Sequence, residues 1–229
     1  MSALNYSESP ESFSPKDYDR FISLGGECFH RFGNIFKLPI EPCPYTWMKR
    51  YYEALPEKGR VLDFGCGKAK PLLRNVGVPA DLYDSCDSDP AGDFTFHSFD
   101  EVPADRGYCL IAANHVFEHL PFMDGVNAAG RLARLLAPGG VFLISVPSPV
   151  HPNRYLTNPL HVTPWNYMNL YALHKMSGLD PYYCARYNKT PGPRWYERPI
   201  VSIVCRVFRM DWCDSVFVVG RLDATKEGK

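Results

Sequence analysis

The sequence predicts a doubly wound α/β domain, in which helices cover both faces of a mostly parallel sheet. Strand-like and helix-like segments alternate from about residue 60, and several of the strand-like segments are apolar almost throughout. Buried parallel strands have that composition because both of their faces are covered. A glycine-containing turn directly after the first strand is the third observation. At 229 residues the chain is long enough for one domain with a well-buried core.

Seven segments have the composition of strands. The clearest begins at Val141, runs through four consecutive apolar residues and is stopped by Pro147. The second segment is weakened by Asp84, which is a poor strand former. The seven segments are residues 61–64, 82–86, 94–99, 108–113, 141–146, 182–187 and 216–222.

Helices are predicted between these strands. A short one follows Pro71, which the first turn of a helix tolerates, and ends before Gly77. An amphipathic helix carries apolar residues from Val126 to Leu136 and ends at the Pro138-Gly139-Gly140 turn. Two further helices are expected at residues 166–176 and 199–210.

Composition excludes some classes of partner. The 25 basic and 25 acidic side chains cancel, which argues against broad electrostatic binding of nucleic acid or of an anionic membrane. We find no secretory signal, and the apolar segments are too short to span a bilayer. None of the eight cysteines forms a C-x-x-C pair, so we expect no metal site and no disulfide framework. Reduced thiols fit a cytoplasmic enzyme.

The most informative stretch is the turn from Val61 to Ala69, which reads Val-Leu-Asp-Phe-Gly-Cys-Gly-Lys-Ala. Glycines after a buried strand let the backbone turn sharply and approach a ligand closely. A dinucleotide-binding turn would place a small residue at position 70, where this chain has Lys70. Asp63, two residues before the first glycine, suits a ligand with a free amino group better than it suits a diphosphate.

This turn resembles motif I of the class I S-adenosylmethionine-dependent methyltransferases, with Ala69 in place of the last glycine. Two further stretches resemble the same family at matching positions. Residues 108–120 look like its fourth strand followed by the Glu118-His119 pair, and residues 134–147 look like its Leu-x-Pro-Gly-Gly entry into the fifth strand. The likeness covers about residues 60–222 and is greatest to the UbiG-like branch, methyltransferase types 11 and 23.

The resemblance implies a Rossmann-like, doubly wound sheet of seven mostly parallel strands with an antiparallel last strand. Residues 1–15 are expected to be a disordered tail. Residues 16–229 would form one methyltransferase domain. Within it, residues 16–59 form an aromatic helical lid, residues 60–147 the cofactor-binding core, and residues 148–229 an acceptor-side insert with the last strands.

The resemblance also implies a site for S-adenosylmethionine at the ends of the first four strands. Asp87 lies 24 residues after Asp63 and matches the acidic residue that binds the ribose hydroxyls, with Asp84 as the alternative. Ser98 and Phe99 match positions that line the adenine. The expected cofactor-binding residues are Asp63, Gly65, Cys66, Gly67, Asp87, Ser98, Phe99, Asn114 and His115.

Two histidines are candidate catalytic residues. The sulfonium cofactor supplies an electrophilic methyl group, so the protein must hold the acceptor atom in line with the methyl–sulfur bond. A hydroxyl acceptor needs a base, whereas an amine or a carboxylate does not. His119 and His161 are the candidates for that base, because imidazole titrates near neutral pH. A structural role is the alternative for each.

We therefore expect an enzyme that methylates a small-molecule acceptor, at oxygen. Nitrogen or carboxyl methylation remains the alternative within the same fold. A non-catalytic, cofactor-binding partner subunit is the alternative from another class. No nucleic acid or membrane partner is expected, and a homodimer is left open.

Overall fold

The computed structural model describes residues 13–151, 155–189, 194–208 and 210–223. Most of the expected tail, residues 1–12, lies outside this part of the chain. Six described strands form one sheet in the order β2-β1-β3-β4-β6-β5. The strands are β1 (Arg60–Phe64), β2 (Tyr83–Cys86), β3 (Tyr108–Asn114), β4 (Leu136–Pro147), β5 (Asp180–Tyr187) and β6 (Ser215–Arg221).

The direction of the strands confirms the α/β prediction. Strands β1 to β4 pair in parallel, and the last strand, β6, runs antiparallel to both β4 and β5. The carboxyl ends of β1, β2, β3 and β4 therefore meet at one edge of the sheet. In folds of this kind, that edge is where ligands bind.

The prediction of seven strands is wrong by one among the described residues. Segment 94–99 makes only an isolated bridge, between Phe96 and Cys86. Next to it, side-chain hydroxyls replace backbone groups: the amide of Ser85 donates to Thr95 Oγ1 at 3.1 Å, and the amide of Thr95 donates to Ser85 Oγ at 3.0 Å. A backbone whose amides bond to side chains does not extend a ladder.

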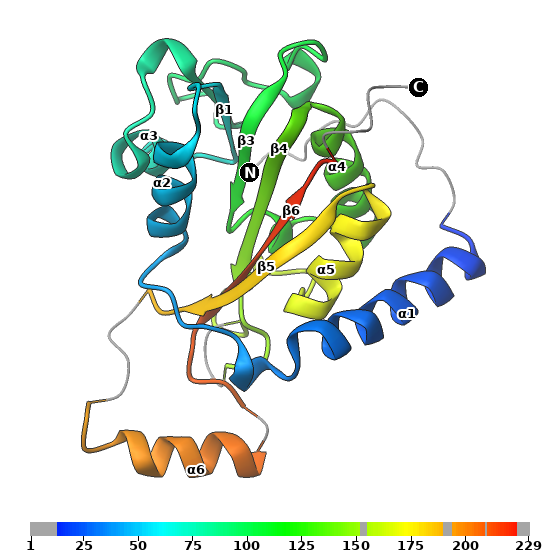
Figure 1. Cartoon of the computed structure of the whole chain (residues 1–229), viewed down its shortest axis with the longest axis vertical. Helices are drawn as coiled ribbons and strands as arrows, with labels where there is room; N and C mark the ends of the chain where they lie inside the picture. Colours follow the sequence, from blue (N-terminus) through cyan, green and yellow to red (C-terminus); the bar gives the residue numbers. More distant parts are fainter. Residues whose placement is uncertain (1–12, 152–154, 190–193, 209, 224–229) are drawn as a thin grey trace.

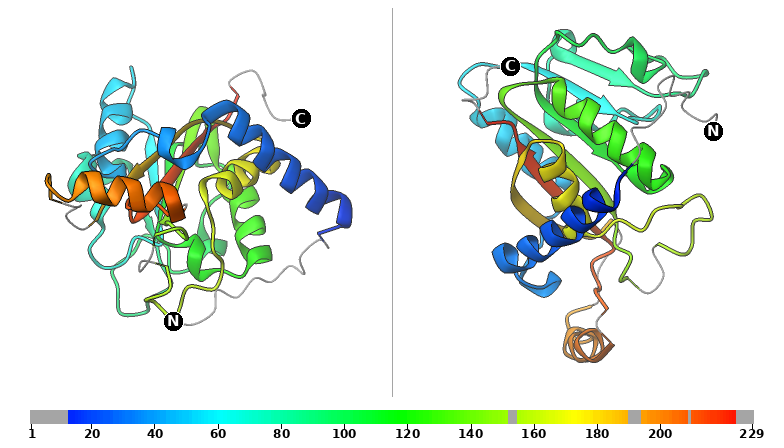
Figure 2. Two further views of the ribbon diagram at one scale, coloured as in Figure 1. Left: turned by 90° about the horizontal axis from the view of Figure 1, so that it is seen from below. Right: turned by 90° about the vertical axis from the view of Figure 1, so that its right-hand side faces the viewer.

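Helices cover both faces of the sheet, as Figures 1 and 2 show. One face carries α2 and α3, and the other carries α1, α4 and α5. Their bounds are α1 (Pro15–Phe32), α2 (Pro44–Ala54), α3 (Pro71–Val76), α4 (Phe122–Arg134), α5 (Tyr167–Met176) and α6 (Arg198–Phe208). Short 3₁₀ turns are η1 (Ile35–Lys37), η2 (Ala80–Leu82), η3 (Phe99–Glu101) and η4 (Phe117–His119).

Side chains of alternate strand residues pack in two separate hydrophobic cores, because successive side chains on a strand point to opposite faces of the sheet. Leu62 and Ile111 belong to the core beneath α1, α4 and α5. Val61 and Leu110 belong to the core beneath α2 and α3. All four are fully buried, which explains why these strands lack polar positions over this stretch.

The first helix packs on α5 and not over the glycine turn. Ser14 caps it, accepting from the Asp17 amide while the Asp17 carboxylate accepts from the Ser14 amide. Its buried face includes Phe21 and Cys28. Of the aromatic segment expected to form a lid, only residues 42–45, just before and within the start of α2, line a cavity at the strand ends.

The chain between α1 and α2 runs along the outer edge of β5. Ile40 forms a parallel bridge with Arg186, whose own amide donates to Pro39 O at 2.9 Å. The buried Arg186 guanidinium donates to Leu38 O at 3.2 Å and pairs with Asp211 at 2.8 Å. This edge strap, residues 36–41, covers backbone groups that an edge strand would otherwise expose.

Helix α6 stands away from the rest of the molecule, beyond the carboxyl ends of the parallel strands (Figures 1 and 2). Cys205 is its one buried residue, and the apolar side chains of Ile200, Ile203, Val207 and Phe208 are exposed. None of the helices that the structure describes has the length and apolarity needed to cross a bilayer. The eight cysteines are all described, and none is in a disulfide.

Candidate functional site

The turn after β1 contains two glycines in a left-handed conformation. Gly65 has a φ of +70° and Gly67 a φ of +56°, a region that side-chain-bearing residues rarely adopt. A Cβ on Gly65 would lie 2.2 Å from Cγ2 of Val116, a clash with the loop that follows β3. At Gly67 a Cβ would meet no atom within 4 Å, so this side of the turn is open.

Asp63 lies beneath this turn and is 1% exposed. Its carboxylate accepts a hydrogen bond from the Tyr83 hydroxyl at 2.9 Å. Burial raises the pKa of Asp63 to about 7, because a charged carboxylate loses its hydration there, and the bond from Tyr83 opposes that rise.

The two acidic candidates for the ribose have different surroundings. Asp87 comes directly after β2, and its Oδ2 accepts from the Gly67 amide at 2.8 Å. Asp84 is buried among other partners, accepting from the Tyr108 hydroxyl at 2.9 Å and lying 3.6 Å from the Arg60 guanidinium. Only Asp87 therefore touches the glycine turn.

The expected adenine-side residues lie at η3. Ser98 Oγ caps this turn by accepting from the Asp100 amide at 3.2 Å. Phe99 is buried, with its ring centroid 5.1 Å from that of Phe64. The Arg131 guanidinium lies 4.1 Å from the same Phe99 ring. Phe99 is therefore a core residue next to the site. Cys66, in the turn itself, is buried, and burial raises the pKa of its thiol to about 12.

At the end of β3, Asn114 and His115 carry unusual features. Asn114 Oδ1 accepts from Ser145 Oγ at 3.1 Å, but its buried amide nitrogen has no partner among the described residues. His115 has a φ of +57°, a strained conformation of the kind found at functional sites. Its ring contacts the Tyr187 hydroxyl at 2.7 Å through Nε2 and Glu118 at 3.1 Å through Nδ1.

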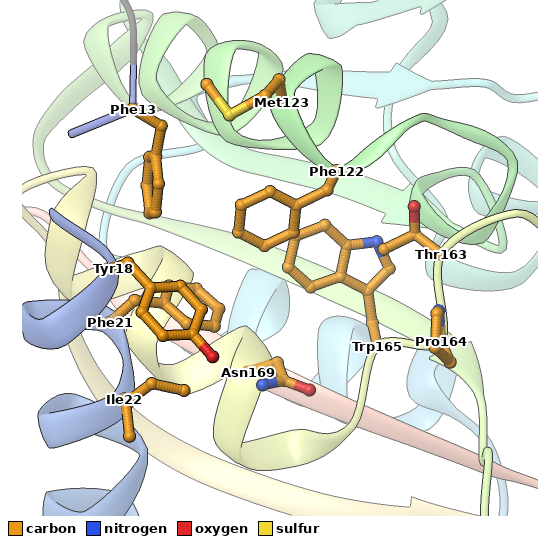
Figure 3. A pocket seen from close by; sticks show the side chains of 10 residues that line it. All are labelled: Phe13, Tyr18, Phe21, Ile22, Phe122, Met123, Thr163, Pro164, Trp165 and Asn169. Carbon is orange, nitrogen blue, oxygen red and sulfur yellow. The ribbon is translucent and has the colours of Figure 1, made fainter. Parts of the chain in front are cut away.

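A cavity of about 230 Å³ lies at these strand ends. It is lined by the last residues of β3 and β5, by the residues that follow them and by the start of α2: Pro42, Cys43, Pro44, Tyr45, Asn114, His115, Tyr187, Asn188 and Lys189. A larger hollow of about 490 Å³ lies between α1 and α4, and half of its lining residues are aromatic (Figure 3). No charged side chain lines that second hollow, whereas Lys189 and the titratable His115 line the smaller cavity.

The two candidate catalytic histidines are neighbours, with ring centroids 5.0 Å apart. His119 lies in η4, and His161 lies in a loop hydrogen-bonded to it: the amides of Val162 and Thr163 both donate to the backbone oxygen of Glu118. Neither histidine lines the cavity. They reach it through Glu118, which is within 4.0 Å of both rings and contacts the ring of His115.

Sequence reasoning missed three contributors. Tyr83 bonds Asp63 across 20 residues and Tyr187 bonds His115 across 72 residues, so only the sheet order could have paired them. Glu118 contacts His115 at 3.1 Å and lies between three histidines, an arrangement that its place beside His119 in the sequence does not reveal. The Glu-His sequence was its only signal.

Comparisons with known proteins agree with this geometry. A family model described as a methyltransferase domain, of type 23, matches residues 43–183. Among curated proteins, no sequence matches the chain.

Solved structures with a similar fold are also methyltransferases. One from Archaeoglobus fulgidus, dependent on S-adenosylmethionine, has 14% identity and a TM-score of 0.56, over 78% of this chain and 92% of its own. A 1,6-didemethyltoxoflavin-N1-methyltransferase from Burkholderia thailandensis, with S-adenosylhomocysteine bound, has 16% identity and a TM-score of 0.52, over 94% and 93%. A putative methyltransferase of Haloferax volcanii, in complex with the Trm112 activator, has 16% identity and a TM-score of 0.53, over 92% and 99%.

At these identities the structural likeness establishes the fold alone, and it agrees with the Rossmann-like prediction. The family model carries more, because it spans over half of the chain and includes the glycine turn, the Glu118-His119 pair and β4. The chain therefore belongs to the methyltransferase domain family and is an S-adenosylmethionine-dependent enzyme, as its sequence predicts.

Proposed function

We propose that this methyltransferase acts on a small-molecule acceptor, at an oxygen atom, by in-line displacement from the sulfonium of S-adenosylmethionine. The observation that carries the proposal is the buried carboxylate of Asp63 beneath a turn of two left-handed glycines, with Asp87 at its rim. This arrangement offers a carboxylate to the amine of the cofactor and another to its ribose. A diphosphate would meet two like charges instead.

Each residue has a role in this proposal. Asp63 attracts the cofactor's amino group, and Asp87 accepts from the ribose hydroxyls while holding the Gly67 amide. The unpartnered amide nitrogen of Asn114 donates to the cofactor's carboxylate. Ser98 lies beside the adenine, with Phe99 supporting it from the core.

In this proposal, the cavity at the strand ends accommodates the methyl-bearing end of the cofactor together with the acceptor. At about 230 Å³ it is smaller than the roughly 300–1,000 Å³ usual for a whole ligand site. The adenosine part therefore lies outside it, along the ends of β1 and β2. The acceptor enters between Tyr45, His115 and Tyr187, which suits a small molecule.

Oxygen is the proposed acceptor atom because two histidines are linked to this cavity through Glu118 and the cavity-lining His115. Transfer to nitrogen or to a carboxylate, which needs no base, is the alternative. The eight free thiols fit an enzyme of the cytoplasm, and no nucleic acid or membrane partner is proposed.

Calorimetry of cofactor binding tests the proposed site. Asp63→Asn and Asp87→Ala should each weaken S-adenosylmethionine binding by about tenfold to a hundredfold, because each substitution removes charge-assisted hydrogen bonds. Asp93→Ala is the matched control, since Asp93 lies near the same turn but is fully exposed. It should bind the cofactor as the unaltered protein does.

Unchanged binding in both site variants, with circular dichroism showing an intact fold, would remove the proposed site. The acceptor is found separately, by incubating the enzyme and labelled cofactor with a metabolite extract. Label on an ether or ester oxygen supports the proposal. Label on nitrogen would replace it with the alternative, and cofactor binding without any transfer would favour a non-catalytic subunit.

A further inference from the structure

Three side chains that the proposed function leaves without a fixed task meet beside the cavity. Glu118 is 1% exposed, and its Oε1 lies 4.0 Å from His119 Nε2 and 4.0 Å from His161 Nε2. One ligand atom from each of the three lies within 4.8 Å of the other two. We propose that Glu118, His119 and His161 bind one divalent transition-metal ion, with Zn²⁺ as the best fit.

The two imidazoles are oriented as metal ligands are. His119 Nδ1 contacts Leu160 O at 3.0 Å, and His161 Nδ1 contacts Tyr155 O at 2.9 Å. A carbonyl oxygen only accepts, so each Nδ1 carries the hydrogen and each neutral ring has its lone pair on Nε2. A backbone carbonyl on the other ring nitrogen is the usual partner of a metal-bound histidine, because it fixes the ring and the tautomer.

Both lone pairs therefore face a carboxylate. The amide nitrogen of Asn158 lies 3.2 Å from His161 Nε2 and donates to it, which agrees with the same tautomer. His115 Nδ1 reaches Glu118 Oε1 at 3.1 Å, but the buried Oε2 has no partner in the part of the chain that the structure describes. No lysine or arginine of that part pairs with Glu118. Three acceptor atoms still converge here, namely Nε2 of each imidazole and a Glu118 oxygen, and a cation between them would stabilise all three.

The chemistry of the donors selects the ion. Two imidazoles and one carboxylate suit Zn²⁺ and its neighbours, whereas Mg²⁺ and Ca²⁺ prefer oxygen ligands throughout. Tetrahedral zinc with bonds of about 2.0–2.1 Å needs ligand atoms about 3.4 Å apart. The two distances of 4.0 Å, from Glu118 Oε1 to the Nε2 atoms of His119 and His161, would shorten to that value if the side chains moved by about half an ångström. The expectation of no metal site considered only the cysteines, whereas these three ligands come from two turns whose histidines lie 42 residues apart.

Three protein ligands leave one position of the ion open, as in catalytic zinc sites. If the enzyme methylates oxygen as proposed above, an acceptor hydroxyl bound at that position would lose its proton readily, because the ion stabilises the alkoxide. The site thus favours an acceptor that offers an oxygen donor to the metal. The metal-binding test below is separate from that function, because it measures no methyl transfer.

The experiment titrates chelator-treated full-length protein with Zn²⁺ by calorimetry and with Co²⁺ by visible absorption. We expect one Zn²⁺ per chain and the intense visible bands of a four- or five-coordinate Co²⁺. His119→Gln and Glu118→Gln should each weaken Zn²⁺ binding at least about a hundredfold and abolish those bands. The matched control is His30→Gln, which removes an exposed histidine of α1 and should bind as the unaltered protein does.

Circular dichroism and S-adenosylmethionine binding are recorded for every variant. His119 is partly exposed, so its variant keeps the test decisive even if Glu118→Gln fails to fold. The proposal is overturned if the unaltered protein binds neither Zn²⁺ nor Co²⁺, or if the His119→Gln variant binds Zn²⁺ as tightly as the unaltered protein. A Co²⁺–thiolate band, which would assign the metal to cysteine, would also overturn it. Loss of cofactor binding with metal binding intact would instead contradict the proposed function alone.

Discussion

Burial makes the ionised form of Asp63 unfavourable in the cofactor-free protein and raises the pKa of this carboxyl to about 7. A cofactor ammonium beside it would favour the ionised form, so binding below pH 7 must release a proton. We predict that S-adenosylmethionine affinity rises on the order of tenfold from pH 6.0 to pH 7.5. Calorimetry in two buffers of different ionisation enthalpy measures the released proton directly.

Asp63→Asn is the control for this pH dependence, since it removes the titrating group and keeps the shape. In that variant binding should be weak and nearly independent of pH over the same range. Equal affinities at pH 6.0 and 7.5 in the unaltered protein, with no proton released, would show that Asp63 does not face the ammonium.

At the scale of single residues, the sequence predicted the positions that lie next to one another along the chain. Asp63 lies near the end of β1, the two glycines follow that strand, and Asp87 follows β2. The choice between Asp84 and Asp87 needed the alternation of β2, which turns Asp84 toward Tyr108. Contacts such as that of Tyr187 with His115 depend on strand order, which no local pattern contains.

Two glycines in α4 provide a test at the scale of the element. A Cβ on Gly125 would lie 2.8 Å from Cζ2 of Trp165, whereas a Cβ on Gly130 would meet no atom within 4 Å. Alanine favours a helix by up to about 1 kcal/mol over glycine, but overpacking costs about 1–3 kcal/mol. Gly130→Ala should therefore stabilise the protein, and Gly125→Ala should destabilise it.

Urea denaturation of the two variants measures both changes against the unaltered protein. The pair is matched, because each adds one methyl group to the same helix. Equal stabilisation by both substitutions would mean that Trp165 does not pack against α4 as described. The indole also donates to Phe117 O at 3.0 Å, so this contact joins α4 to the turn that carries Glu118.

The elements that sequence predicted best are those whose residues need no distant partner. Strands β1, β3 and β4 bury both of their faces and are mostly apolar, so composition largely identifies them. Segment 94–99 has the right alternation of Phe94 and Phe96, yet the hydroxyls of Ser85 and Thr95 take the place of ladder bonds. That competition depends on two side chains meeting, so composition could not reveal it.

At the scale of the whole molecule, the carboxyl ends of the parallel strands bring the candidate site residues to one edge of the sheet, and the alternation of strands and helices predicted that parallel sheet. The place of α1 was not predictable, because it depends on contacts across the chain. The Arg31 guanidinium pairs with Asp180 at 3.0 Å across 149 residues, and the Tyr167 hydroxyl donates to Gly33 O at 2.8 Å. Such contacts place the expected lid on α5 and leave only its last residues near the cavity.

A protein cut at residue 43, where the family match begins, would lack both α1 and the edge strap. Losing the buried ring of Phe21 alone removes about 1.5–3 kcal/mol of apolar burial, and Arg186 would lose its backbone acceptors. We predict that a 43–229 fragment aggregates or melts at a much lower temperature than a 13–229 fragment. Scanning calorimetry and gel filtration measure both, and equal melting temperatures would contradict this prediction.

The edge strap has a practical consequence for the limits of this enzyme. The family match gives one boundary for the domain, and the residues needed for a stable fold give another. In this protein the two borders differ by some thirty residues, since the match starts at residue 43 and α1 at Pro15. Anyone who grafts or shortens the catalytic unit should therefore keep the segment from Pro15 to the start of the family match.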